Sequence, residues 1–295
     1  MSIATTSTYS QSFENVLQDR LDQPTTWKEV CDVTISDERT INTSYESTAP
    51  SAQTVTRYTG FDITTTAYVE TNNTLSISTG RDVGYTVDWG DLAQSPWTKP
   101  AELFDRIGAV LNEFIESHWL ADHASWTNFG TASIGGGGTS ADQITVSASN
   151  IDDIIRGVKR EIRENNAEKL MMANGGKPVY VWRAADFEYL EAFTQANGSN
   201  TADDYLVNGT QSGLKYLGGL HYYSNGHTTN HVFAGVKGVQ RLGILRGTYG
   251  RAFTIDFPAA DTNAFISGRT FYSRVDVGRL VPGGHSTAVF DVNVV

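Results

Sequence analysis

The stretch that decides the fold of this chain is one long apolar segment, 101-AELFDRIGAVLNEFIESHWLADHA-124. Its large apolar side chains recur at three- and four-residue spacing, which is typical of an amphipathic helix. They are Leu103, Phe104, Ile107, Val110, Leu111, Phe114, Ile115 and Trp119. Thr98 and Glu102 suit the N-terminal end of such a helix. A helix over Ala101–Ala124 is a rod of about 35 Å, which is long for a globular protein.

Length and composition place the whole chain among globular proteins. The 295 residues suggest one large domain or two ordinary ones. The formal net charge is −11, yet only 19% of residues are charged and 11% are aromatic, which argues against disorder. The excess of acidic residues disfavours a broad nucleic-acid-binding surface. Weakly charged Ser/Thr/Gly segments can instead be covered by neighbouring molecules without burying many charges.

Other classes of protein are disfavoured by simple counts. The single cysteine, Cys31, excludes an intramolecular disulfide framework and a cysteine-based zinc cluster. No apolar run approaches the ~20 residues of a membrane-spanning helix. The N-terminal segment 1-MSIATTSTYSQSFENVLQDRL-21 has neither a basic start nor an apolar centre, so it is not a secretory signal.

The chain before the long helix contains little that could form a core. The spacing of Phe13, Val16, Leu17 and Leu21 predicts a short helix over Ser12–Leu21, either on an extended arm or packed on the core. Residues 33–90 alternate β-branched and polar residues, which indicates strands. Because 40–60 has few large apolar side chains, an extended hairpin that packs on something else fits it better than an edge sheet of one domain.

The chain after the long helix mixes helices and strands. A glycine row, Gly135–Gly138, indicates a loop, and Asn150 is a candidate N-cap for a helix ending near Asn165. Lys177–Trp182 is predicted to be a buried strand, followed by a helix over Ala184–Gln195. Six more strands are expected, at Leu220–Tyr223, His231–Ala234, Val239–Leu245, Phe253–Phe257, Ala264–Val277 and Ala288–Val294. The absence of regular βαβ alternation favours an α+β fold.

The histidines are the first candidates for chemistry. His118 and His123 are five residues apart on the predicted long helix, so they point to different faces and do not form a zinc-binding H-E-x-x-H pair. His221, His227 and His231 lie in a turn-rich segment and could meet around a metal. No carboxylate or cysteine stands beside them at ligand spacing, so surface histidines are the preferred interpretation.

The remaining motifs are also better explained by structure than by catalysis. Gly135–Gly138 lacks the Lys-Ser/Thr of a phosphate-binding loop, and there is no G-x-S-x-G motif. Cys31 reads as a small buried residue. Asp88 and Asp91 favour a turn over a cation site. The basic stripe of the second helix, Arg156, Lys159, Arg160 and Arg163, is interleaved with acidic residues, which favours ion pairs with its own helix or with another subunit.

The order of the elements resembles that of the HK97-like major capsid proteins of tailed double-stranded DNA bacteriophages. The resemblance covers essentially the whole chain and rests on order, not on a strict motif. The matching segments are Leu75-Ser-Ile-Ser with Tyr85-Thr-Val-Asp-Trp-Gly-Asp-Leu92, the long helix Ala101–Ala124, Gly176-Lys-Pro-Val-Tyr-Val-Trp-Arg-Ala-Ala-Asp-Phe-Glu-Tyr-Leu190, Gly218-Gly-Leu-His-Tyr-Tyr-Ser-Asn225 and Val232-Phe-Ala-Gly-Val-Lys-Gly-Val239. They resemble the descending arm of the E-loop, the spine helix, the strand and helix of the A-domain, and the strand pairs that follow.

The resemblance implies a division of the chain into five parts. Residues 1–32 would be an N-terminal arm that reaches a neighbouring subunit, and 33–92 would be an E-loop lying over an adjacent subunit. Residues 93–149 would form the P-domain with its spine helix, completed by C-terminal strands in 262–295. Residues 150–261 would be the A-domain, whose loops near 197–215 would surround the five- and six-fold axes.

The resemblance also implies the function and the partners. Hexamers and pentamers of the chain would close into an icosahedral shell around phage DNA, with the virion as its location and the host cytoplasm as the place of assembly. The protein partners would be a separate scaffolding protein (or none), a portal and a decoration protein. Packaged DNA would touch the inner face of the shell through non-specific contact. No membrane is involved. We expect no enzymatic activity, no cofactor, and no catalytic or metal-binding residue.

Two alternatives stay open at this point. An encapsulin-type nanocompartment shares this fold but packages enzymes in place of DNA. A hydrolase whose site cannot be recognised in a single sequence is the second alternative.

Overall fold

The computed structural model describes residues 14–21, 25–46, 69–88, 98–165, 167–173, 177–196, 214–227, 230–257 and 268–295. Residues 14–21 are helical. The other helices are α2 (Thr26–Val30), α4 (Thr98–Leu120), α5 (Thr131–Ile134), α6 (Ile151–Glu164), α7 (Glu168–Ala173) and α8 (Ala184–Ala196), with short 3-10 turns η1 (His123–Ser125) and η2 (Gly283–Ala288).

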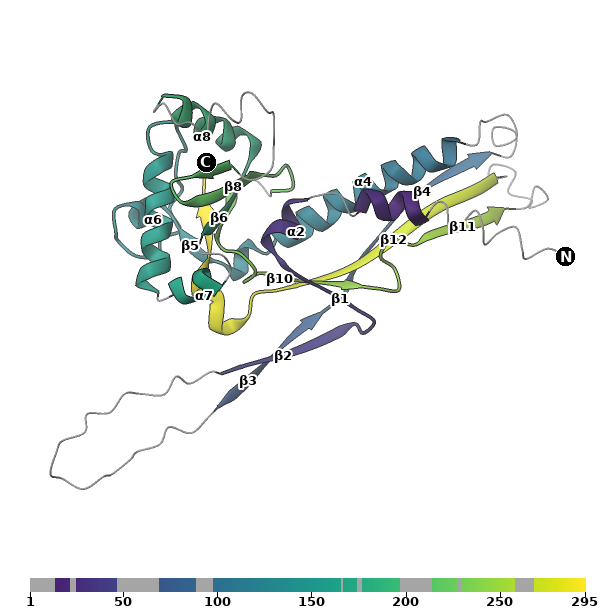
Figure 1. Ribbon diagram of the computed structural model, residues 1–295, viewed down its shortest axis with the longest axis horizontal. Helices are drawn as coiled ribbons and strands as arrows, with labels where there is room; N and C mark the ends of the chain where they lie inside the picture. The colour runs from purple at the N-terminus through teal and green to yellow at the C-terminus, as the bar shows by residue number, and fades with distance from the viewer. Residues whose placement is uncertain are drawn as a thin grey trace, which may run out of the picture.

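The strands form three sheets. They are β1 (Asp32–Ser36), β2 (Thr40–Glu46), β3 (Glu70–Ser76), β4 (Thr79–Asp88), β5 (Thr127–Phe129), β6 (Pro178–Trp182), β7 (Leu214–Tyr216), β8 (Gly219–Tyr223), β9 (His231–Val236), β10 (Arg241–Leu245), β11 (Ala252–Phe257), β12 (Gly268–Leu280) and β13 (Val289–Asn293). Figure 1 shows a compact lobe around β6, an elongated region in which α4 lies along β12, and the β2–β3 hairpin projecting away from both.

The predicted long helix is present as α4 and supplies the spine of the elongated region. The centre of its apolar stripe is fully buried, through Phe104, Ile107, Leu111, Ile115 and Trp119, whereas Val110 is 41% exposed. The helix ends at Leu120, four residues before the predicted end. The chain turns there, because the N–H of Asp122 donates to the Trp119 carbonyl and the next residues form η1. His123 therefore lies outside the helix, contrary to the sequence-based prediction.

The N-terminal helical segment packs on α4 of the same chain. Leu17 and Leu21 are fully buried, and the Asn112 side chain donates to the Arg20 carbonyl at 3.1 Å. The segment crosses α4 at Gly108, where a Cβ would lie 2.9 Å from the Cγ atom of Arg20. Two alternatives were predicted for Ser12–Leu21, a helix on an extended arm or a helix packed on the core. The described residues 14–21 form a helix packed on the core.

The elongated sheet is built around the long strand β12. β10 and β11 pair with successive parts of one edge of β12, and β1 extends the sheet beyond β10 as a parallel strand. β4 pairs along its own full length with the other edge of β12. The predicted 33–92 segment is thus divided: β1 and β4 belong to this sheet, and β2 and β3 form the hairpin. The strands β10 and β11, expected within 150–261, also lie in this sheet.

The compact lobe contains a six-stranded sheet in the order β5-β13-β9-β6-β8-β7. Every residue of β6 is buried, as predicted for Lys177–Trp182, because α8 packs on β6 and β8 while α6 packs on β9 and α8. The predicted helices at 150–165 and 184–195 are confirmed as α6 and α8. The C-terminal strands separate, since β12 lies in the elongated sheet and β13 pairs with β9 and β5 in this lobe.

Among the described residues, the helices are too short or too polar to span a bilayer.

Candidate functional site

The β2–β3 hairpin is the part of the molecule that lacks a core of its own. Its register runs from Thr40 opposite Ser76 to Glu46 opposite Glu70, and along β3 only Leu75 is buried. Polar contacts hold the exposed pairs, such as the Thr74 hydroxyl donating to the Asn42 side-chain oxygen at 2.9 Å. An isolated two-stranded hairpin is marginally stable in water and presents unpaired backbone groups along both edges. Its described strands are therefore a candidate surface for another copy of the chain.

The base of the hairpin is fixed by two facing glycines of the elongated sheet. Gly243 of β10 and Gly278 of β12 are directly opposite in the register. A Cβ on Gly243 would lie 2.3 Å from a methyl group of Leu75, and one on Gly278 would lie 2.1 Å from the Ser76 carbonyl oxygen. The missing side chains leave the space into which Leu75 and Ile77 pack. The direction in which the hairpin leaves the molecule thus depends on these glycines.

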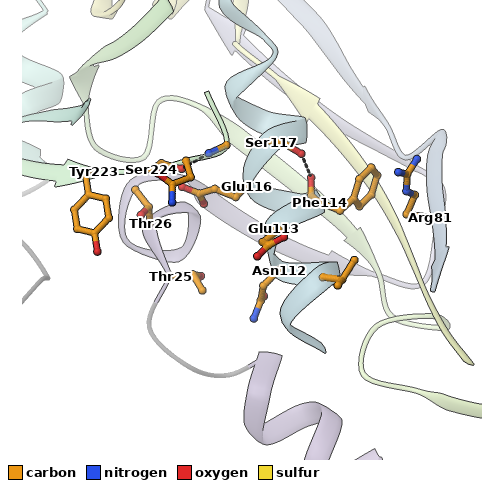
Figure 2. Close-up of a pocket in the computed structure, with 13 residues that line it drawn as sticks. Thr25, Thr26, Arg81, Asn112, Glu113, Phe114, Glu116, Ser117, Tyr223 and Ser224 are labelled. Atoms are coloured by element: carbon orange, nitrogen blue, oxygen red, sulfur yellow. Dashed lines mark hydrogen bonds between the residues drawn. The ribbon is translucent and has the colours of Figure 1, made fainter. Parts of the chain in front are cut away.

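A second candidate is an open cleft of about 630 Å³ between α4, the start of α2 and the segment after β8 (Figure 2). Its lining residues are mostly polar. They are Thr25, Thr26, Arg81, Val110, Asn112, Glu113, Phe114, Glu116, Ser117, Tyr223, Ser224, Asn225 and Gly226. Among these lining residues there is no histidine or cysteine, so the cleft does not offer the nucleophile and base of a Ser-His or Cys-His arrangement.

Glu116 in this cleft has a structural role. Its Oε2 atom accepts hydrogen bonds from the backbone N–H of Trp27 at 3.1 Å and from the indole N–H of Trp119 at 3.2 Å. Burial raises the pKa of Glu116, and the hydrogen bonds that it accepts oppose that rise. The carboxylate thereby ties the N-terminal helix α2 to α4. The neighbouring hydroxyl of Ser117 donates to the Phe114 carbonyl of its own helix.

The histidines predicted from the sequence as a possible group, His221, His227 and His231, are not brought together as one cluster. His221 is fully buried, stacks on Tyr180 with ring centroids 4.7 Å apart, and accepts the indole N–H of Trp182 at its Nδ1 atom. It supports the packing of β6. His231 instead faces a carboxylate on another strand.

His231, His123 and Asp291 form the cluster that sequence reasoning missed. The Nδ1 atom of His231 lies 2.9 and 3.0 Å from the two carboxylate oxygens of Asp291. The rings of His123 and His231 are stacked, with centroids 3.7 Å apart and 9° between their planes. The residues come from η1, β9 and β13. The available signal was an acidic residue inside the apolar strand 289-VFDVN-293, since an isolated carboxylate there needs a partner.

The basic stripe of α6 is used within the chain. Arg156 pairs with Asp152 at 2.8 Å, and Arg160 lies 3.8 Å from Glu164, in both cases four residues away along the helix. Arg160 also donates to the carbonyl of Ser133, and Lys159 donates to that of Leu217. The predicted ion pairs within the helix are confirmed, and Arg156, Lys159 and Arg160 bind carboxylates or carbonyls of their own chain.

The other motifs have local explanations. Cys31 is buried, and burial is the main cause of the raised pKa of its thiol. Gly135–Gly138 follows the short helix α5, where Gly136 and Gly138 take positive φ values of 89° and 77° that favour glycine. β4 ends at Asp88, whereas Asp91 lies outside the described residues. Of the predicted axial loops near 197–215, residues 197–213 also lie outside them, and 214–215 belong to β7.

Comparison with known proteins identifies the fold. No protein-family model matches the chain, and no curated protein matches it. Solved structures do match. The capsid of an empty GTA particle has a TM-score of 0.59 at 11% identity, covering 91% of this chain and 95% of that one. The capsid of Ralstonia phage GP4 has a TM-score of 0.59 at 9% identity, and the match covers 90% of this chain and 87% of that one. A virus-like particle from Pyrococcus furiosus has a TM-score of 0.58 at 10% identity, and the match covers 97% of this chain and 99% of that one.

The chain therefore has the fold of these capsid structures along almost its whole length. This confirms the α+β class and the HK97-like fold that the order of elements predicted. At these low identities the similarity establishes the fold, and function has to be argued separately from the surfaces of this chain.

Proposed function

We propose that this chain is the major capsid protein of a tailed double-stranded DNA bacteriophage, and that its hexamers and pentamers close into an icosahedral shell. The observation that carries the proposal is the β2–β3 hairpin, which projects from a capsid-type fold (Figure 1) and whose described strands pack on the rest of the chain at their base, through Leu75. A strand pair without a core is stabilised when a second surface covers it. In a shell, that surface is an adjacent subunit.

The other surfaces fit a structural role. The cleft beside α4 binds its own N-terminal segment through Glu116, and the cations of α6 are paired within the chain. A net charge of −11 limits adhesion to the packaged genome, so contact with DNA would be local and non-specific. The expected absence of enzymatic activity belongs to this proposal.

The proposal extends to location and partners. Subunits would assemble in the host cytoplasm and end in the virion. A scaffolding protein, a portal and a decoration protein would be its partners in the shell, besides further copies of the chain itself. Residues 1–32 would contact a neighbouring subunit, although the described part of that segment also packs on α4 of its own chain.

The direct test is electron microscopy of the purified, overexpressed chain. We expect closed shells or capsomer rings. In the test variant, residues 43–73 are replaced by an Asn-Gly turn, which joins Asn42 to Thr74 where they already pair. This variant should keep cooperative unfolding and lose assembly. The exposed substitution Glu188→Gln on α8 is the control and should assemble normally.

Three results would contradict this proposal. A wild-type chain that stays a monomer at high concentration is not a shell protein under these conditions. Normal shells from the variant without residues 43–73 would show that the hairpin is not the intersubunit contact. Loss of cooperative unfolding in that variant would place the hairpin in the core of the subunit instead.

A cargo-carrying shell of the encapsulin type is the second candidate. The similarity to the Pyrococcus furiosus virus-like particle, over 97% of this chain and 99% of the other, is a similarity of fold that fits both kinds of shell. The contents of shells purified from the natural source separate the two candidates. Nuclease-protected double-stranded DNA supports the phage capsid, and a protein cargo without DNA supports the nanocompartment.

A further inference from the structure

The cluster of His123, His231 and Asp291 has the composition of a metal site. Each residue offers one ligand atom, and these atoms all lie within 4.8 Å of one another. Two imidazole nitrogens and one carboxylate oxygen are the donor set by which proteins hold first-row divalent metals, with positions left for water or a further ligand. We propose that these three residues bind a divalent transition metal of the Zn²⁺ class.

The electrostatics of the cluster favour a cation. Asp291 is 4% exposed, and among the described residues its ion-pair partner is His231. A buried carboxylate requires a compensating charge. The positive charge of Arg279 contributes to lowering the pKa of His123, but Arg279 is itself paired with Asp122 at 3.3 Å. Among the described residues, no lysine or arginine pairs with Asp291, so a cation bound here would meet a carboxylate without a basic side chain of that kind.

The protonation of the histidines suits metal binding. Burial, followed by the nearby His231, lowers the pKa of His123. A neutral imidazole presents the lone pair that a metal needs. A metal at the Nδ1 atom of His231 would lie on the side of the ring that faces the Asp291 carboxylate, whose nearer oxygen is 2.9 Å away.

The geometry defines what must move. The two stacked rings present parallel faces 3.7 Å apart, so their lone pairs do not yet converge on one point. His123 is partly exposed and belongs to the three-residue turn η1, whereas Asp291 and His231 are held by the β9–β13 ladder. Rotation of the His123 ring toward Asp291 completes the site. The ion would then join the segment after α4 to two strands of the compact lobe.

Hard cations are a poor fit for this donor set. Ca²⁺ and Mg²⁺ prefer six or more oxygen ligands or a complete octahedron of oxygens. With two nitrogens and one carboxylate, the cluster should distinguish Zn²⁺ and Co²⁺ from Mg²⁺ and Ca²⁺. This selectivity separates a built site from general attraction of cations to an acidic protein.

The test uses the full-length chain after removal of metal by chelation. Zn²⁺ should raise the melting temperature of the wild type, Mg²⁺ should not, and Co²⁺ should give visible absorption bands of a nitrogen-ligated ion. His123→Ala should bind Zn²⁺ at least about 10-fold more weakly and lose the Co²⁺ bands. His123 is the ligand to vary first, because its partly exposed side chain can be removed without opening the core. Asp291→Asn is the second variant and should also lose binding.

His285→Ala is the matched control, since His285 is a half-buried histidine of η2 outside the cluster. It should keep the wild-type response. The proposal is overturned if the wild type shows neither the Zn²⁺ shift nor the Co²⁺ bands. It is also overturned if His123→Ala and Asp291→Asn respond like the wild type, or if His285→Ala loses the response as well. None of these readouts depends on shell assembly, so failure here leaves the proposed function untouched.

Discussion

The strand β6 and the strand β3 show two opposite ways of using β structure in one chain. In β6, 178-PVYVW-182, every side chain is buried, and the Tyr180 and Trp182 polar atoms find partners at 3.1 Å in Ile155 and His221. In β3, 70-ETNNTLS-76, Leu75 alone is buried. The first strand is stabilised by its own subunit. The second leaves its described surfaces to water in the isolated chain, so under the proposed function a neighbouring subunit stabilises it.

The largest effect should come from opening the core around β6. Trp182→Ala removes a fully buried indole and leaves His221 without its donor, so we expect a loss of about 3–5 kcal/mol in the free energy of unfolding. Chemical denaturation measures it. The control is Tyr189→Ala, which removes an aromatic ring that is 42% exposed and should change stability by about 0.5 kcal/mol or less. Similar losses in both variants would contradict the contrast.

The next effect is an acid sensitivity confined to the packed part of the molecule. Burial is the main cause that lowers the pKa of His118 and of His227 to about 4. The unfolded chain, with a histidine pKa of about 6.5, binds more protons below that pH, so stability falls as the pH drops from 6.5 toward 4. Each histidine should cost on the order of 2 kcal/mol between pH 7 and pH 5. Glu116, whose pKa is raised by burial, acts in the opposite direction.

Denaturation of His227→Asn at several pH values isolates one of these contributions. The difference in unfolding free energy between the wild type and this variant should shrink by about 2 kcal/mol from pH 7 to pH 5. The variant in which an Asn-Gly turn replaces 43–73 should keep the wild-type pH profile. A flat difference for His227→Asn, or an altered profile in the variant without the hairpin, would place the acid-sensitive groups elsewhere.

A stability effect similar to that of one histidine, with a large effect on assembly, is expected where the two regions meet. In Gly278→Ala the new Cβ would lie 2.1 Å from the Ser76 carbonyl oxygen, so the hairpin backbone must shift. We expect a loss of about 1–3 kcal/mol, measured by denaturation, and fewer closed shells by electron microscopy. Gly247→Ala is the control, because a Cβ there meets no atom within 4 Å. Normal shells from Gly278→Ala would show that the hairpin direction is not set at this glycine.

Much of the fold was predictable from local patterns. The apolar spacing in 101–124 predicted α4, and the five buried residues of β6 follow from the continuous apolar run before Arg183. The end of α4 was predicted four residues too late, because Ala121 to Ala124 remain compatible with a helix, whereas the Asp122 side chain binds Gln240 and Arg279 from distant parts of the chain. Short elements such as α2, α5 and α7 gave no periodic signal of sufficient length.

The candidate surfaces were predictable to different degrees. The small number of large apolar side chains in 40–60 already indicated a hairpin that needs a partner, and the described part of this segment, 40–46, forms β2 of that hairpin. The Gly243 and Gly278 pair was not predictable, since a close approach between distant strands is decided by their register. The cluster of His123, His231 and Asp291 joins residues up to 168 positions apart, 291 − 123, so no spacing along the chain reveals it.

The sequence by itself determined the elements and their order, because a 3.6-residue or two-residue period is a property of neighbouring side chains. It also determined that one segment could not build a core. Only the tertiary structure decided which strands share a sheet. It places β12 and β13 in different sheets, connects β1 to β12 through β10, and pairs β4 with β12 directly. Strand pairing and side-chain clusters depend on contacts between distant residues, and those contacts exist once the whole chain has packed.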